Sequence, residues 1–78
     1  MSYLEFREDV FASGRHRTRV WRVHSAQHGG ELGTIKWFGR WRQYTFNPEP
    51  GTTFNPDCLR EIASYCFTRT QLHRTGNR

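Results

Sequence analysis

The sequence has few of the features typical of secreted, disulfide-rich or membrane-spanning proteins. It holds two cysteines in 78 residues, and no apolar run approaches the roughly 18 residues of a membrane span. The first residues, SYLEFREDV, lack the basic and apolar regions of a signal peptide. These absences argue against membrane insertion and secretion, and they predict a cytoplasmic protein.

The two cysteines are not expected to form a disulfide. Cys58 and Cys66 both fall in a predicted helix, where their separation is roughly 12 Å at about 1.5 Å per residue, beyond the reach of a disulfide. Neither belongs to a CxxC pair. We therefore expect two reduced thiols that behave as small buried hydrophobic side chains and have no redox or metal role.

Acidic side chains are also scarce. Seven of them stand against twelve basic ones, which gives a net charge of +5, and every basic residue except Lys36 is an arginine. Between Arg15 and Arg42 the only acidic residue is Glu31. This imbalance favours anionic partners.

Apolar residues are few but bulky, because aromatics make up 15% of the chain. Such residues suit one small domain over residues 1–78.

The stretch Leu32 to Phe46 predicts a β-hairpin. Two alternating runs flank Gly39-Arg40, and a type II′ turn at these two residues would place Phe38 opposite Trp41 and Ile35 opposite Tyr44. Side chains alternate along a strand, so one face would be apolar and the other mixed. The expected core face carries Ile35, Trp37, Tyr44 and Phe46. The expected outer face carries Thr34, Lys36, Phe38, Trp41, Gln43 and Thr45.

The remaining pattern completes an α+β fold. Alternation predicts four strands, at about 3–11, 17–25, 32–38 and 41–47. Asn55 as cap, Pro56 at the first helical position and Asp57 predict a helix over about 56–74, with a frayed tail at 75–78. The expected core stripe of this helix is Leu59, Ile62, Ala63, Cys66, Phe67 and Thr70. We predict a four-stranded antiparallel β-meander with one C-terminal helix packed on one face.

Two resemblances accompany this pattern. The segment Gly33 to Phe38, GTIKWF, resembles the opening of a cold-shock domain, but Arg40-Trp41-Arg42-Gln43 stands where that family has glycines. A predicted helix also replaces its last strands, so we do not expect the cold-shock fold. Over Leu32 to Phe67, the pattern LGxIxWxxxWRxYxFxP followed by FNPxxLxxI resembles small uncharacterised bacterial and phage proteins. That resemblance implies an α+β accessory protein with no assigned chemistry.

The sequence offers no assembled catalytic or metal site. His16, His24, His28 and His73 fall in a turn, a strand, a loop and a helix end. His24 and His28 lack a third ligand at metal-binding spacing, and Gly29-Gly30 is not followed by a helix that would complete a phosphate loop. We therefore expect no enzymatic activity and no cofactor.

A binding role has more support. On the outer face, cations stand among aromatics, an arrangement that suits a polyanion, because arginine neutralises phosphate while an exposed tryptophan stacks on an unpaired base. A strand pair placed in a DNA major groove is an alternative mode. The predicted nucleic-acid-binding residues are Arg15, Arg17, Arg22, His24, Lys36, Phe38, Arg40, Trp41 and Gln43.

A protein partner is the alternative to nucleic acid. Tryptophan and arginine dominate protein interfaces, and an uncovered sheet face around Phe38, Trp41, Thr34 and Thr45 would also suit a homodimer. Arg42 is expected on the inner side, stacked on Trp37.

Overall fold

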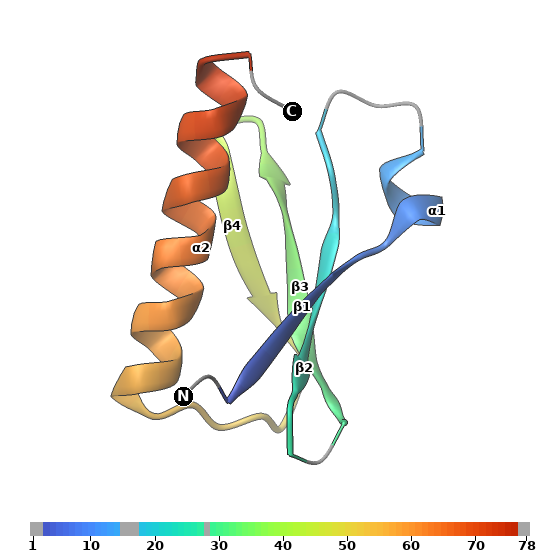
Figure 1. Cartoon of the computed structure of the whole chain (residues 1–78), viewed down its shortest axis with the longest axis vertical. Coiled ribbons are helices and arrows are strands. Elements are labelled where there is room, and N and C mark those ends of the chain that lie inside the picture. Colours follow the sequence, from blue (N-terminus) through green and yellow to red (C-terminus); the bar gives the residue numbers. More distant parts are fainter. Residues whose placement is uncertain (1–2, 15–17, 28, 77–78) are drawn as a thin grey trace.

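The computed structural model describes residues 3–14, 18–27 and 29–76 of the chain. Its elements are β1 (Leu4–Glu8), α1 (Val10–Ser13), β2 (Trp21–Ser25), β3 (Glu31–Phe38), β4 (Gln43–Pro48) and α2 (Pro56–Arg74). The strands form one antiparallel sheet in the order β1-β2-β3-β4, and α2 packs on one face of it (Figure 1). The predicted α+β class and meander topology are confirmed.

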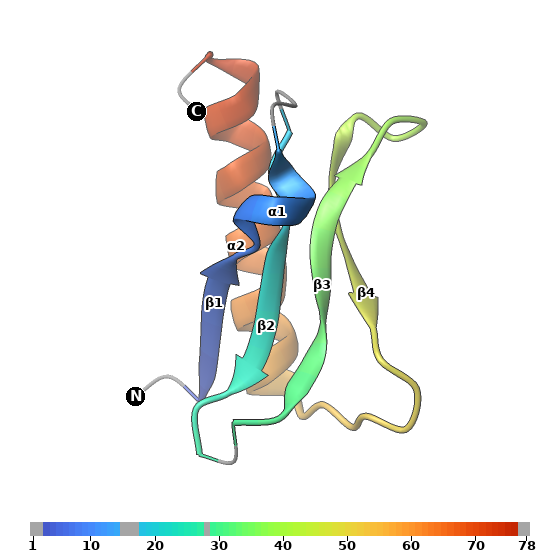
Figure 2. The same ribbon diagram turned by 90° about the vertical axis from the view of Figure 1, so that its right-hand side faces the viewer.

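A short helix, α1, replaces the end of the predicted first strand. The Asp9 side chain accepts a hydrogen bond of 3.0 Å from the backbone N–H of Ala12, and Gly14 ends the turn at a φ of 52°. The strand predicted over about 3–11 is therefore too long, since β1 ends at Glu8 and Val10, the first residue of α1, is 65% exposed. Helix α1 lies on the face of the sheet opposite α2 (Figure 2).

The hairpin between β3 and β4 differs from its prediction by two residues. Phe38 lies opposite Gln43, and Trp37 lies opposite Tyr44. The predicted two-residue turn at Gly39-Arg40 is therefore wrong, since four residues, 39–42, connect the strands. A displacement of two residues preserves side-chain alternation, so Ile35, Trp37, Tyr44 and Phe46 still face α2, as expected.

Helix α2 begins where the sequence indicates, but its buried face is rotated. The Asn55 side chain accepts a 2.8 Å hydrogen bond from Cys58 N–H. Ile62, Cys66 and Thr70 are buried, whereas the predicted core residues Leu59, Ala63 and Phe67 are exposed. The helix lies nearest the edge strand β4 (Figure 1). One flank of the predicted stripe is therefore left uncovered by the sheet. Neither described helix is long and apolar enough to cross a membrane.

The core between sheet and helix is built from aliphatic and aromatic side chains. Val23 and Ile35 are fully buried, and Tyr44 packs edge-on against Trp21 at 5.3 Å between ring centroids. The other buried hydrophobic residues are Leu4, Trp21, Ile62 and Cys66. The ring of His73, from α2, packs on Trp37 with 4.4 Å between the ring centroids. It occupies the position that was expected for Arg42. Aromatic pairs thus give a short chain a large buried area.

One close contact packs β4 against β3, and a hydrogen bond joins β4 to α2. The Phe46 ring lies over Gly33, where a β-carbon would come within 2.6 Å of the Phe46 ring and of the Asn47 carbonyl oxygen, so the site requires glycine. The Thr70 hydroxyl accepts a 3.0 Å hydrogen bond from Tyr44 N–H and donates to the Cys66 carbonyl at 2.8 Å. A backbone donor on the open edge of β4 is therefore satisfied by α2.

Candidate nucleic-acid interface

The end of the β3–β4 hairpin, residues 36–43, gathers several of the predicted binding residues, and we call it the hairpin tip. The Phe38 carbonyl accepts hydrogen bonds from Trp41 N–H at 3.2 Å and from Arg42 N–H at 2.9 Å. The left-handed residue of the loop is Arg42, with a φ of 53°, and not Gly39. Arg74 Nη2, in the last turn of α2, donates to the Arg42 carbonyl at 3.3 Å. The loop is thereby tied to the helix.

An exposed aromatic pair occupies the hairpin tip. The rings of Phe38 and Trp41 meet edge to face, with centroids 4.8 Å apart. Phe38 is 39% exposed and Trp41 is 64% exposed, so the pair rigidifies the tip without being withdrawn from solvent. Such a pair offers a face on which a planar group can stack.

Three exposed cations belong to the same hairpin tip. Lys36, Arg40 and Arg42 form no ion pair with any carboxylate in the described part of the chain. By contrast, Arg7, Arg19 and Arg60 are each paired with a carboxylate, at 2.6 to 2.8 Å. Arg42 lies in the loop and not over Trp37, so its predicted inward stacking is wrong. The positive charge of the tip is therefore available to an external anion.

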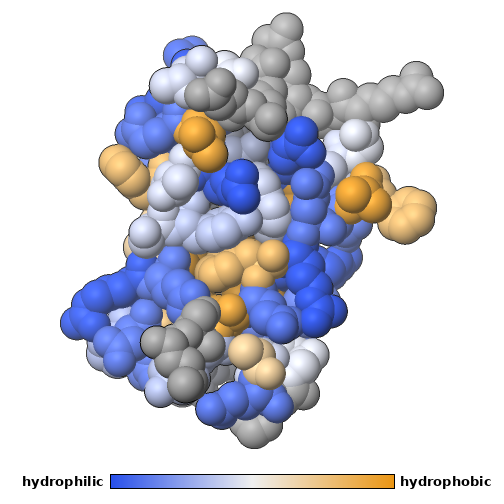
Figure 3. Space-filling view, viewed as in Figure 1, coloured by the Kyte–Doolittle hydropathy of each residue, from blue (hydrophilic) through white to orange (hydrophobic). Residues whose placement is uncertain are grey.

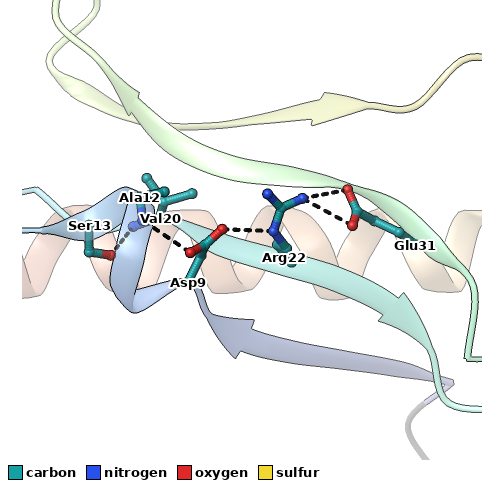
Figure 4. A network of polar contacts seen from close by, with 6 residues as sticks. All are labelled: Asp9, Ala12, Ser13, Val20, Arg22 and Glu31. Atoms are coloured by element: carbon teal, nitrogen blue, oxygen red, sulfur yellow. Dashed lines mark hydrogen bonds and ion pairs between the residues drawn. The ribbon is translucent and has the colours of Figure 1, made fainter.

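Arg22 lies on the outer face as predicted, but it is already neutralised (Figure 4). Its Nε donates to Asp9 Oδ2 at 2.8 Å, and its Nη1 contacts both Glu31 oxygens at 2.9 and 3.0 Å. The Ala12 N–H and the Arg22 guanidinium together hold the pKa of Asp9 below its ordinary value, while Asp9 and Glu31 raise the pKa of Arg22. Arg22, on β2, thus serves as a clamp that joins the N-cap of α1 to β3.

A β-bulge brings Glu31 to this clamp. The pairing of β2 with β3 shifts between Val23 and His24, which leaves Leu32 between Gly33 and Glu31 without a strand partner. The extra residue inverts the alternation, so Leu32 packs against the core while Glu31 reaches Arg22 on the outer face.

The other predicted binding residues are more dispersed. His24 is half-buried on β2, opposite Glu31, and Gln43 is exposed at the start of β4. Arg15 and Arg17 lie outside the described residues, as does His28, the suggested partner of His24 in metal binding. Within residues 3–14, 18–27 and 29–76, no group of three metal-ligating side chains is present.

Sequence reasoning missed the surface of α1. Phe11 is 95% exposed and stands beside exposed Val10, although the turn that carries them is held firmly. Asp9 caps it, and the buried Ser13 hydroxyl accepts a 2.8 Å hydrogen bond from Val20 N–H (Figure 4). The available signal was the capping residue Asp9 followed by Ser13 and Gly14, but Asp9 was included in the strand predicted over about 3–11.

The two thiols differ in burial, and Cys66 is the more deeply buried. Cys58 and Cys66 are both free. Burial raises the pKa of the Cys66 thiol to about 11, so at neutral pH it is protonated and a poor nucleophile.

Comparison with known proteins gives limited help. No family model matches the chain, and no solved structure matches it. Over 34 residues the chain is 47% identical to an uncharacterized 9.3 kDa protein of Acholeplasma phage L2. The match covers 44% of this chain and 44% of the phage protein, so it extends over less than half of either.

Proposed function

We propose that this chain is a small, non-enzymatic, cytoplasmic nucleic-acid-binding protein that engages single strands through its hairpin tip. The observation that supports the proposal is the exposed Phe38–Trp41 pair among cations that lack carboxylate partners in the described part of the chain. A base would stack on Trp41, while Lys36, Arg40 and Arg42 would contact the adjacent phosphates.

A single strand fits this tip better than a duplex. Base stacking needs an unpaired base, and both rings of the aromatic pair are exposed at the end of the hairpin. Arg22 and its two carboxylate partners add no net positive charge beside the tip. The row of cations that could contact phosphates is therefore shorter than the sequence suggested. We place its centre at the hairpin tip and not on the middle of the sheet. The proposal also includes that the chain is related to small phage accessory proteins.

The first test is the salt dependence of binding, followed by fluorescence anisotropy of a labelled oligothymidylate of about 15 nucleotides. Each phosphate contact with a single strand contributes a slope of about −0.7 in log affinity against log salt. Arg40→Ala should make the slope shallower by about that amount, whereas Trp41→Ala should weaken binding by about 1–3 kcal/mol with the slope nearly unchanged.

Arg60→Ala is the matched control, because Arg60 lies on α2 and is paired with Asp57 at 2.7 Å. It removes the same charge from the molecule and should leave both affinity and slope close to those of the unaltered protein. No binding at low salt to single- or double-stranded DNA or RNA would refute the nucleic-acid proposal. An equal loss of slope in Arg60→Ala would mean that net charge alone drives binding.

A protein partner, or self-association, is the second candidate, and the surface of α1 favours it. Phe11 and Val10 are exposed on a clamped helical turn, and rigid exposed aromatics are typical anchors of protein interfaces. Sedimentation velocity over a range of concentrations tests self-association. If Phe11→Ser or Trp41→Ala converts a dimer into a monomer, that surface is the interface, and a monomer at every concentration leaves only a different protein as partner.

A further inference from the structure

A groove runs along the side of α2 that faces β1. It has a volume of about 470 Å³ and is lined by Phe6 of β1 and, from α2, by Glu61, Ser64, Tyr65, Thr68, Arg69 and Leu72. This volume falls in the usual range for small-molecule sites, about 300–1,000 Å³. The space-filling view, from the same direction as Figure 1, shows an apolar patch beside α2 that is framed by hydrophilic side chains (Figure 3).

The groove exists because one helix cannot cover four strands. A helix is about 10 Å wide, whereas four strands spaced about 4.8 Å apart span roughly 14 Å. Since α2 lies nearest β4, the inner face of β1 is left beside the helix and not beneath it. Phe6 and Tyr65 bridge the space by stacking, with ring centroids 4.1 Å apart and planes 4° from parallel.

Arg69 is the distinctive residue of this groove. Its guanidinium carbon lies 4.8 Å from the Trp21 ring and 5.0 Å from the Tyr65 ring, and its Nη2 donates to the Tyr65 hydroxyl at 3.1 Å. The side chain is half-buried, yet no carboxylate among the described residues pairs with it. Two aromatic rings hold the cation in place, and its other donors remain for a ligand.

We propose that this groove binds a small organic anion, a carboxylate carried on an aromatic or aliphatic body. Arg69 would take the carboxylate in a charge-assisted hydrogen bond, and the body would lie on Phe6, Tyr65 and Leu72, with the hydroxyls of Ser64 and Thr68 at the rim. Glu61 lies about 12 Å from Arg69 along the helix axis, so the carboxylate is directed to the Arg69 end of the groove. This site is separate from the hairpin tip and does not depend on its function.

The test uses 4-phenylbutyrate and its neutral analogue 4-phenylbutanamide as probes in amide chemical-shift titrations of the isotope-labelled full chain. The carboxylate should shift the amides of Phe6, Tyr65, Arg69 and Leu72. The amide, which has the same body without the charge, should bind about tenfold more weakly or worse, since a hydrogen bond to a charged group is lost.

Arg69→Met, which keeps much of the packing over Trp21, should remove the preference for the carboxylate, and Arg60→Met should retain it. If Arg69→Met fails to fold, the comparison of the two probes on the unaltered protein still decides. Equal binding of the two probes, or no shift at the groove residues, would overturn the proposal. Shifts at residues 36–43 alone would place the anion at the hairpin tip and would equally overturn it.

Discussion

At the scale of single residues, pairing decides which cations of this basic protein are free to act. Arg22 stands in the middle of the arginine-rich segment, but Asp9 and Glu31 neutralise it. Lys36, Arg40 and Arg42 have no such partners within the described residues. The sequence shows the excess of charge, but the pairing depends on a capping turn and a β-bulge that alternation does not reveal. Of the described basic residues between positions 18 and 42, those without a carboxylate partner are therefore Lys36, Arg40 and Arg42, all in the hairpin tip.

The clamp at Asp9 has a defined pH dependence. The pKa of the Asp9 carboxyl in the folded chain is lower than its ordinary value of 3.8. The ionised carboxylate therefore stabilises the fold fully above pH 3.8, and this stabilisation is lost as the pH falls through the lower pKa of the folded chain. Asp9→Asn keeps a side-chain oxygen for the Ala12 N–H but removes the ion pair with Arg22. The variant should unfold at lower urea concentration near pH 7, and its difference from the unaltered protein should shrink near pH 2.5.

Asp57→Asn is the control for net charge, because among the described residues Asp57 is paired with Arg60 alone, and that pair is exposed. It should shift the urea midpoint less than Asp9→Asn does. If Asp9→Asn shifts the midpoint equally at both pH values, its effect comes from the turn of α1 and not from the ion pair.

At the scale of elements, the sequence predicts a helix start that carries strong capping residues, but it predicts less well which face of the helix is buried. The start of α2 follows from Asn55, Pro56 and Asp57, and it agrees with the structure. Its buried face does not, because Tyr65, Arg69 and His73 reach the sheet with long amphipathic side chains while Phe67 is left exposed. In the hairpin, two registers that differ by two residues satisfy the same alternation, so only the loop geometry chooses between them.

The rotation of α2 can be tested by a pair of substitutions. Ile62 is 4% exposed, so Ile62→Ala should cost roughly 2–5 kcal/mol of unfolding free energy. Phe67 is 65% exposed, and Phe67→Ala should change stability by no more than about 0.5 kcal/mol. Urea denaturation measures both. A comparable loss in the two variants would restore the face expected from the sequence and contradict the observed packing.

The candidate site was only partly predictable for a similar reason. Phe38, Arg40 and Trp41 were named from their position at a hairpin end, and the structure brings them together at that end. Phe11 and the Arg69 groove were missed, since the first depends on a single helical turn and the second on how much of the sheet α2 covers. Arg42 was placed by the wrong register, and its position over Trp37 is filled by His73.

At the scale of the whole molecule, the surfaces proposed for binding are distinct. The hairpin tip lies at the end of the sheet beside the last turn of α2, to which Arg74 links it (Figure 1). The groove at Arg69 opens on the opposite flank of α2 from β4, and α1 projects from the other face of the sheet (Figure 2). Binding at one of these surfaces therefore leaves the others accessible, and each can be tested in the same labelled protein.

The central claim is that the hairpin tip binds single-stranded nucleic acid, and chemical-shift mapping with a short oligothymidylate at low salt tests it most directly. The amides of residues 36–43 and the indole N–H of Trp41 should shift, and those of α1 and of the Arg69 groove should not. The shifts should shrink as salt is raised, because phosphate contacts release counterions. An unchanged spectrum at low salt, or shifts centred on Val10 and Phe11 with none at Trp41, would contradict the account.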